Sequence, residues 1–177
     1  MSACSTHRPG HRCSPLPDNL TLITIPSFTG NAAPPVLWDL ERYRLVARLE
    51  GHVGFVYSAR FVAGGQTIVT AGADGTAGLW DGKTGQLHQI FHGGSDFLAD
   101  ATITPDGLML VAGGGDGLVR FWDASSARPL WTLPAHKSHV IGIHFEGDSI
   151  VTRGFAGDVS RWTLPLPAQV IEAGLSK

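Results

Sequence analysis

The chain has 177 residues, of which 43% are hydrophobic, and its 13 lysines and arginines nearly balance its 15 aspartates and glutamates. This composition is typical of a globular protein, and the net charge of -2 gives no electrostatic attraction to nucleic acid or to an anionic membrane. No apolar run reaches the ~20 residues that a membrane helix needs, and no signal peptide is recognisable, so we expect an intracellular, cytoplasmic protein.

The first 13 residues hold both cysteines of the chain and two histidines, at Cys4, His7, His11 and Cys13. These side chains could bind zinc, because thiolate and imidazole are among its usual ligands. The segment also contains a proline, a glycine and two arginines, and it lacks the apolar residues that would enclose a metal site. We therefore expect a disordered tail over residues 1–13 and keep a metal site as the alternative.

Between residues 14 and 50, turn signals alternate with short apolar runs. Ser14-Pro15 precedes a run from Leu20 to Ile25, and a second run from Val36 to Trp38 follows. Residues 31–35 contain two prolines and separate the runs as a loop, because proline cannot donate to a strand ladder. This order predicts a sheet whose first strand is eroded or missing.

The tryptophans reveal an internal repeat. Four of the five lie 42, 42 and 40 residues apart, at Trp38, Trp80, Trp122 and Trp162, and the first three are followed by aspartate. Three windows that end on the last three of these tryptophans align without a gap, at residues 69–80, 111–122 and 151–162. Repeats of this length are typical of solenoids and propellers.

Within one repeat, four short apolar runs are separated by turns that contain glycine. In the first repeat the runs are residues 55–61, 66–71, 77–80 and 86–91. Short runs with tight turns predict antiparallel strands rather than helices, and the turns explain why the chain has 23 glycines. We therefore expect an all-β chain with a four-stranded sheet about every 42 residues, and such sheets stack radially into a β-propeller.

The repeat resembles the WD40 family, through a Gly-His near its start and a Trp-Asp near its end. The resemblance covers roughly residues 35–165 and rests on the joint spacing of the four tryptophans. It implies a tail at 1–13, a degenerate partial blade at 14–50, three WD40 repeats at 51–91, 92–135 and 136–174, and a tail at 175–177. Three complete blades and one partial blade are few for a ring, so we expect an open or incomplete propeller.

In WD40 proteins a buried aspartate, a histidine, a serine or threonine and a tryptophan form one hydrogen-bonded network in each blade. By this resemblance the three repeats supply His52, Asp74 and Trp80, then Asp116 and Trp122, then His136 and Trp162. The expected hydroxyl, two residues before the aspartate, is replaced by Gly72, Gly114 and Gly154. In addition, His92 is displaced and Ala156 replaces the third aspartate. We expect no repeat to have a complete network and interpret its members as structural rather than catalytic.

One departure from the repeat points to a partner. Where the first two repeats have alanine or glycine, the third has Arg153 and Phe155, which share strand parity. The family resemblance places this strand end near the face where WD40 propellers bind peptides and proteins, and an arginine beside an exposed aromatic ring is typical of interface anchors. Phe55 and Phe97, which open the first strands of two repeats, are expected on the same face. The alternative is that Phe155 packs locally.

A second possible metal cluster consists of His136, His139 and His144, although the repeat register places the first in the network and the others in a strand. The chain contains no phosphate-binding loop, nucleophile elbow or dinucleotide fingerprint. We therefore predict no catalytic residue, no metal site and no cofactor.

The leading hypothesis is a non-catalytic protein–protein interaction scaffold that binds a peptide or protein through blade-top loops. This step rests on the family resemblance, since a fold alone does not define a function. The alternatives are a regulatory or sensory propeller fragment of a larger signalling protein, and a metal-binding protein or enzyme that uses the Cys/His clusters. A second copy or a second chain could complete the ring.

Overall fold

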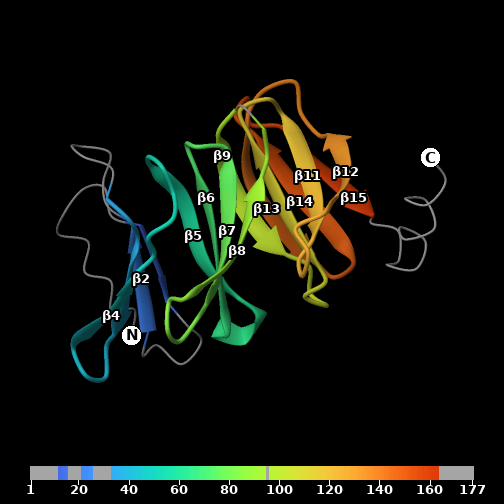
Figure 1. Cartoon of the computed structure of the whole chain (residues 1–177). Coiled ribbons are helices and arrows are strands. Elements are labelled where there is room, and N and C mark those ends of the chain that lie inside the picture. The colour runs from blue at the N-terminus through green and yellow to red at the C-terminus, as the bar shows by residue number, and fades with distance from the viewer. Residues whose placement is uncertain (1–11, 16–20, 26–32, 95, 164–177) are drawn as a thin grey trace.

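The computed structural model describes residues 12–15, 21–25, 33–94 and 96–163, mainly as strands and tight turns. Fifteen strands form four antiparallel sheets, which we call blades 1 to 4 in chain order. Figure 1 shows them following one another from the blue blade 1 to the orange and red blade 4. The only helical element in the described part of the chain is one 3-10 turn, Ala63–Gly65, and no helix there could cross a membrane.

Each blade is a meander in which consecutive strands are neighbours. Blade 1 consists of β1 (Arg12–Pro15), β2 (Thr21–Ile25), β3 (Val36–Asp39) and β4 (Arg44–Arg48). Blade 2 consists of β5 (Val56–Val62), β6 (Thr67–Gly72), β7 (Thr76–Asp81) and β8 (Leu87–His92). Blade 3 consists of β9 (Leu98–Ile103), β10 (Met109–Gly114), β11 (Leu118–Asp123) and β12 (Pro129–Pro134). Blade 4 consists of β13 (Val140–Glu146), β14 (Ser149–Gly154) and β15 (Val159–Thr163).

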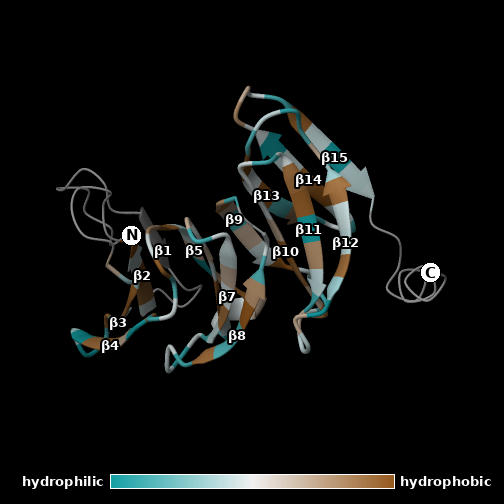
Figure 2. Cartoon of the chain, turned by 45° about the horizontal axis from the view of Figure 1, so that its top comes forward, coloured by the Kyte–Doolittle hydropathy of each residue, from teal (hydrophilic) through white to brown (hydrophobic). Residues whose placement is uncertain are grey.

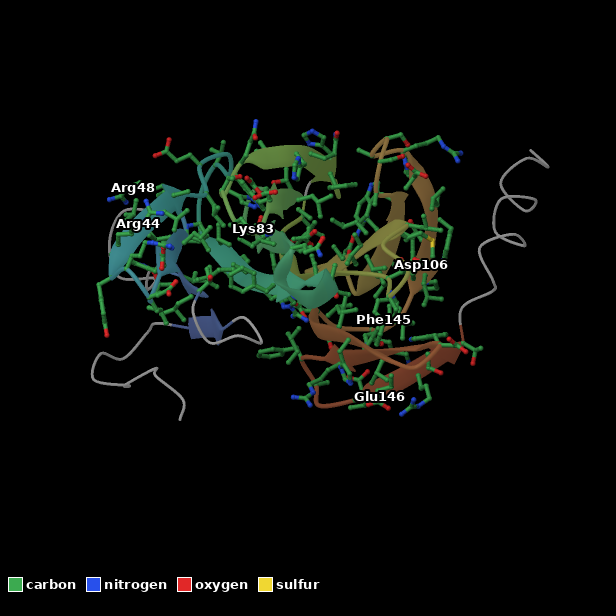
Figure 3. The ribbon with its side chains drawn as sticks, turned by 90° about the horizontal axis from the view of Figure 1, so that it is seen from below. Arg44, Arg48, Lys83, Asp106, Phe145 and Glu146 are labelled. Atoms are coloured by element: carbon green, nitrogen blue, oxygen red, sulfur yellow. The ribbon has the colours of Figure 1, made fainter. Side chains whose placement is uncertain are left out.

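The blades form an open arc. The innermost strands lie next to one another, since β5 contacts β1 and β9, and β9 contacts β13. Seen from below in Figure 3, Arg44 and Arg48 mark blade 1 at one end of the arc, and Phe145 and Glu146 mark blade 4 at the other. This arrangement confirms the expected all-β, incomplete propeller. We call the end of the blades that carries the turns β6–β7, β10–β11 and β14–β15 the upper end, and the opposite end the lower end.

The described residues give blade 4 three strands, and blade 1 keeps the first strand that the sequence indicated as eroded or missing. Blade 1 has four strands, because Arg12–Pro15 pairs with β2 from Arg12↔Ile25 to Pro15↔Leu22. Two residues that we assigned to the tail, Arg12 and Cys13, therefore belong to a strand. This strand has only four residues and is too short to show an alternating pattern of apolar and polar residues. The last part of the third predicted repeat, residues 164–174, lies outside the described residues, as do residues 1–11 and 175–177 of the predicted tails.

Neighbouring blades pack face to face through one buried cluster at each junction. We call the face that a blade turns toward the next blade its forward face, and the other its rear face. The forward face of blade 2 presents Val69, Ala71 and Ala77 to Leu98 and Trp122 on the rear face of blade 3. Hydrophobic residues accordingly run along the strands in Figure 2, where they appear brown, while many turn residues are teal or white.

A buried carboxylate links three blades. Asp100 on β9 accepts a hydrogen bond of 2.8 Å from the Ser58 hydroxyl of blade 2 and one of 2.8 Å from the Ile143 backbone N–H of blade 4. Arg60 of blade 2 pairs with the same carboxylate and donates to the Ile143 carbonyl at 3.0 Å. Because Asp100 is only 4% exposed, these partners replace the water that its carboxylate oxygens would otherwise bind, and the arrangement fixes three innermost strands relative to one another.

The aspartates that follow the tryptophans close turns at the lower end. Asp123 accepts hydrogen bonds from the hydroxyl groups and backbone N–H groups of Ser125 and Ser126. These bonds lower the pKa of Asp123 from 3.8 to about 2. Backbone donors likewise lower the pKa of Asp81 and of Asp39, through Thr84 and Arg42 respectively. The Asp of each Trp-Asp pair is thus a turn cap.

These caps predict a loss of stability in acid. The folded-state pKa of Asp123 lies below its unfolded value, so the associated stability is present above pH 3.8 and is lost as the pH falls toward 2. We expect the melting temperature to fall over this range, and to fall less in the Asp123→Ala variant, which has no carboxylate to protonate. Thermal melts followed by circular dichroism at several pH values check this, and an identical acid dependence in both proteins would contradict it.

Candidate functional site

Blade 2 contains a complete chain of buried hydrogen bonds. The Trp80 indole N–H donates to the Thr70 hydroxyl oxygen at 2.9 Å, and that oxygen lies 2.7 Å from His52 Nε2. His52 Nδ1 lies 3.1 Å from the Asp74 carboxylate. With the imidazole proton on Nδ1, each member donates to the next. Burial raises the pKa of Asp74, but hydrogen bonds from Thr76 and other donors outweigh it, so the pKa lies below its ordinary value.

The hydroxyl of this network belongs to Thr70, so the expected gap at Gly72 does not exist. A Cβ atom on Gly72 would lie 2.6 Å from His52 Nδ1 and 2.9 Å from Asp74 Oδ1. The histidine and aspartate therefore occupy the space that a side chain at residue 72 would need. Glycine at this position is a requirement of the network rather than a sign of its decay.

Blade 4 also has a complete network. The Trp162 indole N–H donates to the Thr152 hydroxyl at 3.2 Å, and the same hydroxyl lies 2.9 Å from His136 Nε2. His136 Nδ1 pairs with Asp158, and this hydrogen bond lowers the pKa of the Asp158 carboxyl.

The carboxylate of blade 4 comes from a different position in the turn. Ala156 aligns with Asp74, so the sequence indicated that the acid was lost, but Asp158 two residues later replaces it. Asp158 aligns with Thr76, whose hydroxyl already lies 3.0 Å from His52 Nδ1 in blade 2. Both positions of this turn can therefore reach the histidine ring.

Blade 3 has an ion pair in place of the network. Gly94 occupies the histidine position and Ala112 the threonine position. Asp116 is bound instead by Arg120, whose Nη1 lies 3.2 Å from the carboxylate. Burial raises the pKa of Asp116, but the hydrogen bond and charge of Arg120 lower it below its ordinary value. His92 is exposed at the end of β8, and Trp122 remains buried with its ring centroid 6.1 Å from that of Phe91.

These networks are built for structure. The His52 side chain is only 2% exposed, and both of its ring nitrogens have partners inside the blade. A general base must reach a substrate proton, which His52 cannot do in this arrangement. In blade 1 the Trp38 indole N–H likewise donates to a hydroxyl, that of Thr24, at 3.2 Å.

A row of aromatic rings crosses the upper end of blades 2 to 4. Tyr57 on β5 meets Phe97 edge to face with ring centroids 5.4 Å apart, Phe97 meets His139 at 5.3 Å, and His139 meets Phe155 at 5.8 Å. We call Tyr57, Phe97, His139 and Phe155 the aromatic row. Phe155 is 71% exposed, so the row opens to solvent.

The repeat explains how the row is assembled. Phe55, Phe97 and His139 occupy equivalent positions, and their carbonyl oxygens accept hydrogen bonds of 2.8 to 3.0 Å from the backbone N–H groups of the next upper turn in their own blade. Phe97 and Phe155 thus lie in one surface, as we expected, but His139 connects them. Phe55 is half-buried, and the ring that meets Phe97 from blade 2 is that of Tyr57. Because His139 aligns with Phe97, the sequence repeat could have predicted that His139 belongs to this surface. No feature of the repeat predicts that Tyr57 does.

Arg153 lies apart from the row, on the forward face of blade 4. It pairs across the sheet with Gly142 and Val159, and its side chain is exposed. Phe155, two residues later, adjoins both this face and the row.

The proposed histidine cluster does not form. His136 belongs to the blade 4 network, His139 to the aromatic row, and His144 pairs with Glu146 at 3.0 Å. Within the described ranges, no three histidine, cysteine, aspartate or glutamate side chains come together as metal ligands. Cys4, His7 and His11 lie outside those ranges, and Cys13 lies in β1.

A small hollow lies between blades 1 and 2 at the upper end. It has a volume of about 140 Å³ and is lined by residues that include Pro34 of blade 1 and His52 and Gly54 of blade 2. Pockets that hold a drug-sized ligand are usually larger, at about 300 to 1,000 Å³. The hollow therefore does not define a small-molecule site.

Comparison with known proteins identifies the repeat. The family model described as "WD domain, G-beta repeat" matches residues 43–81 and 85–123. Curated proteins provide no match. The crystal structure of the computationally designed Ika8 protein is similar, with 21% identity and a TM-score of 0.69 over 82% of this chain and 43% of that chain. The designed Ika4 protein is similar with 20% identity and a TM-score of 0.72 over 91% of this chain and 96% of that chain. These likenesses concern the fold alone, and the chain spans less than half of Ika8.

The blade 2 network predicts opposite roles for Thr70 and Gly72. Thr70→Val leaves a buried indole N–H and a buried imidazole nitrogen without a partner, so we expect a loss of about 3 kcal/mol in the free energy of unfolding. Gly72→Ser should also destabilise the protein, since its Cβ would collide with His52, although it supplies a hydroxyl at the position the sequence indicated. Chemical denaturation measures both, with Thr132→Val, at an exposed position of strand β12, as the control for loss of a threonine hydroxyl. A stabilised Gly72→Ser variant would contradict the assignment.

Proposed function

Residues 43–81 and 85–123 are WD40 repeats, and we propose that the chain containing them is a non-catalytic protein–protein interaction scaffold that binds a peptide or protein segment at its aromatic row. The observation that carries this proposal is the contact of rings from three successive blades, ending in the exposed Phe155. The upper-end turns of the blades surround this row, in line with the blade-top binding expected from the sequence.

The energetics favour a binding role for the row over a packing role. The Phe155 side chain is 71% exposed, so its hydrophobic surface stabilises the isolated chain only slightly. Burying that surface against a partner would contribute about 1.5 to 3 kcal/mol to the free energy of binding. Phe97 and His139 hold the ring from one side and limit the conformational freedom that binding would otherwise remove. Aromatic anchors held in this way are typical of binding hot spots. Of the other partner-binding candidates, Phe55 lies on blade 2 two residues before Tyr57, and Arg153 lies apart from the row on the forward face of blade 4.

The row is tested with peptides selected from a random displayed library on the wild-type protein. We expect Phe97→Ala, His139→Ala and Phe155→Ala each to weaken the selected peptides about tenfold or more, measured by fluorescence anisotropy. The matched control is Tyr43→Ala, because Tyr43 is 91% exposed but lies in the turn before β4 at the lower end. The proposal would be wrong if all three row variants bound the peptides with wild-type affinity, or if Tyr43→Ala lost as much affinity as they did.

The open arc leaves a second copy of the chain as the alternative partner, because a ring needs its two end faces covered. We expect a monomer instead, since the forward face of blade 4 carries Arg153 and Arg161 where the inner blades carry small or apolar residues. Light scattering on the purified chain should give a mass near 18.8 kDa. Twice that mass would show ring completion or another form of self-association.

A further inference from the structure

The forward face of blade 4 differs in kind from the equivalent faces of the inner blades. In blades 2 and 3 this face packs against the next blade, and Ala71, Ala77 and Val119 are among its fully buried residues. The aligned residues of blade 4 are Arg153 and Val159, and Arg161 takes the place of Leu79 and Phe121. Figure 2 shows the outcome, since β15 is drawn mostly in pale colours.

A further blade could not pack on this face as the inner blades pack. A Cβ atom on Gly113 of blade 3 would lie 2.8 Å from Val140 Cγ1 of blade 4, so the inner junction has no room for a side chain there. Arg153 places a long side chain at that same position. Moreover, Gly142 stands where blade 3 has Asp100, the carboxylate that holds the following blade through the Ile143 N–H.

The face is nevertheless apolar in its upper part. Three of the large hydrophobic side chains that are exposed in the described residues lie on blade 4: Ile141 at 44%, Val159 at 60% and Phe155 at 71%. Val159 and Gly142 flank Arg153 across the sheet. Ile141 aligns with Tyr57, whose ring points toward the next blade, so both belong to the forward face. We call Ile141, Arg153, Phe155 and Val159 the blade 4 patch.

The charges on this face favour an anionic partner. Arg161 and His144 both pair with the one carboxylate there, that of Glu146, while the nearby Asp158 is bound by His136. Arg153 has no ion pair with any residue in the described ranges. The face therefore presents an unneutralised guanidinium group in the middle of three apolar side chains.

We propose that the blade 4 patch binds an extended segment of a protein partner that carries acidic residues next to apolar ones. A carboxylate of the segment pairs with Arg153, for which a bidentate geometry is available. The apolar neighbours of that carboxylate cover Ile141, Phe155 and Val159. This surface is separate from the aromatic row except at Phe155, so the test avoids that residue.

The probe is a short fluorescent peptide that alternates glutamate with leucine and phenylalanine, and the matched peptide has lysine in place of glutamate. We expect the wild-type protein to bind the glutamate peptide more tightly than the lysine peptide, and this affinity should fall as the salt concentration rises. The Arg153→Glu and Val159→Ser variants should each bind the glutamate peptide at least about fivefold more weakly than the wild-type protein does. Arg128→Glu, on an exposed turn at the lower end, is the charge control and should leave binding unchanged. Leu108→Ser, at an exposed apolar position in the turn between β9 and β10 at the lower end, is the matched control for Val159→Ser and should also leave binding unchanged.

Equal binding of the two peptides, or the same loss in Arg128→Glu as in Arg153→Glu, would overturn the proposal. A dimer that Arg153→Glu dissociates would also overturn it, because the patch would then be an interface between copies of the chain. Circular dichroism confirms that the variants are folded, as expected for exposed positions.

Discussion

The need to bury the apolar faces that neighbouring sheets turn toward one another is the constraint on which the rest of this structure depends. A four-stranded sheet that is apolar on both sides is stable only between two neighbours, and here the neighbours approach so closely that Gly113 has no room for a side chain beside Val140. The forward faces of blades 2 and 3 must therefore carry residues as small as Ala71, Ala77 and Gly113. This requirement, and not only the tight turns, accounts for part of the high glycine content.

The sequence repeat and the blade are offset by one strand. The family match over residues 43–81 spans β4 to β7, and that over 85–123 spans β8 to β11. Each repeat thus contributes the outer strand of one blade and three strands of the next. No strand ladder of the described residues crosses between blades, so the buried junction clusters and the Asp100 hydrogen bonds hold neighbouring blades together.

The periodicity predicted the fold well, because local patterns determine where strands and turns form. It predicted less well which side chains contact one another across strands and turns. Thr70 and Gly72 lie on the same face of β6, so alternation alone cannot say which supplies the hydroxyl; the position of the His52 ring decides. Asp158 replaces the acid missing at Ala156 through turn geometry, which no alignment shows. Strand β1 was not predicted because its four residues include Ser14-Pro15, which is typical of a turn rather than a strand. The inter-blade role of Asp100 was not predicted because the aligned residues, Ser58 and Gly142, are not acidic.

The same constraint explains why the candidate binding residues gather on blade 4. Arg153 of blade 4 aligns with Ala71 and Gly113 of blades 2 and 3. Phe155 aligns with Ala73 and Gly115. In the inner blades the next blade forbids large side chains at the first of these positions, and the glycine at the second leaves room for Phe97. On the forward face of blade 4 these positions are exposed, so no neighbouring blade limits their size, while the strand still holds each side chain in a fixed direction. Blade 4 can therefore present rigidly placed arginine and aromatic groups that the buried junctions could not accommodate, which is the preorganisation that tight binding requires.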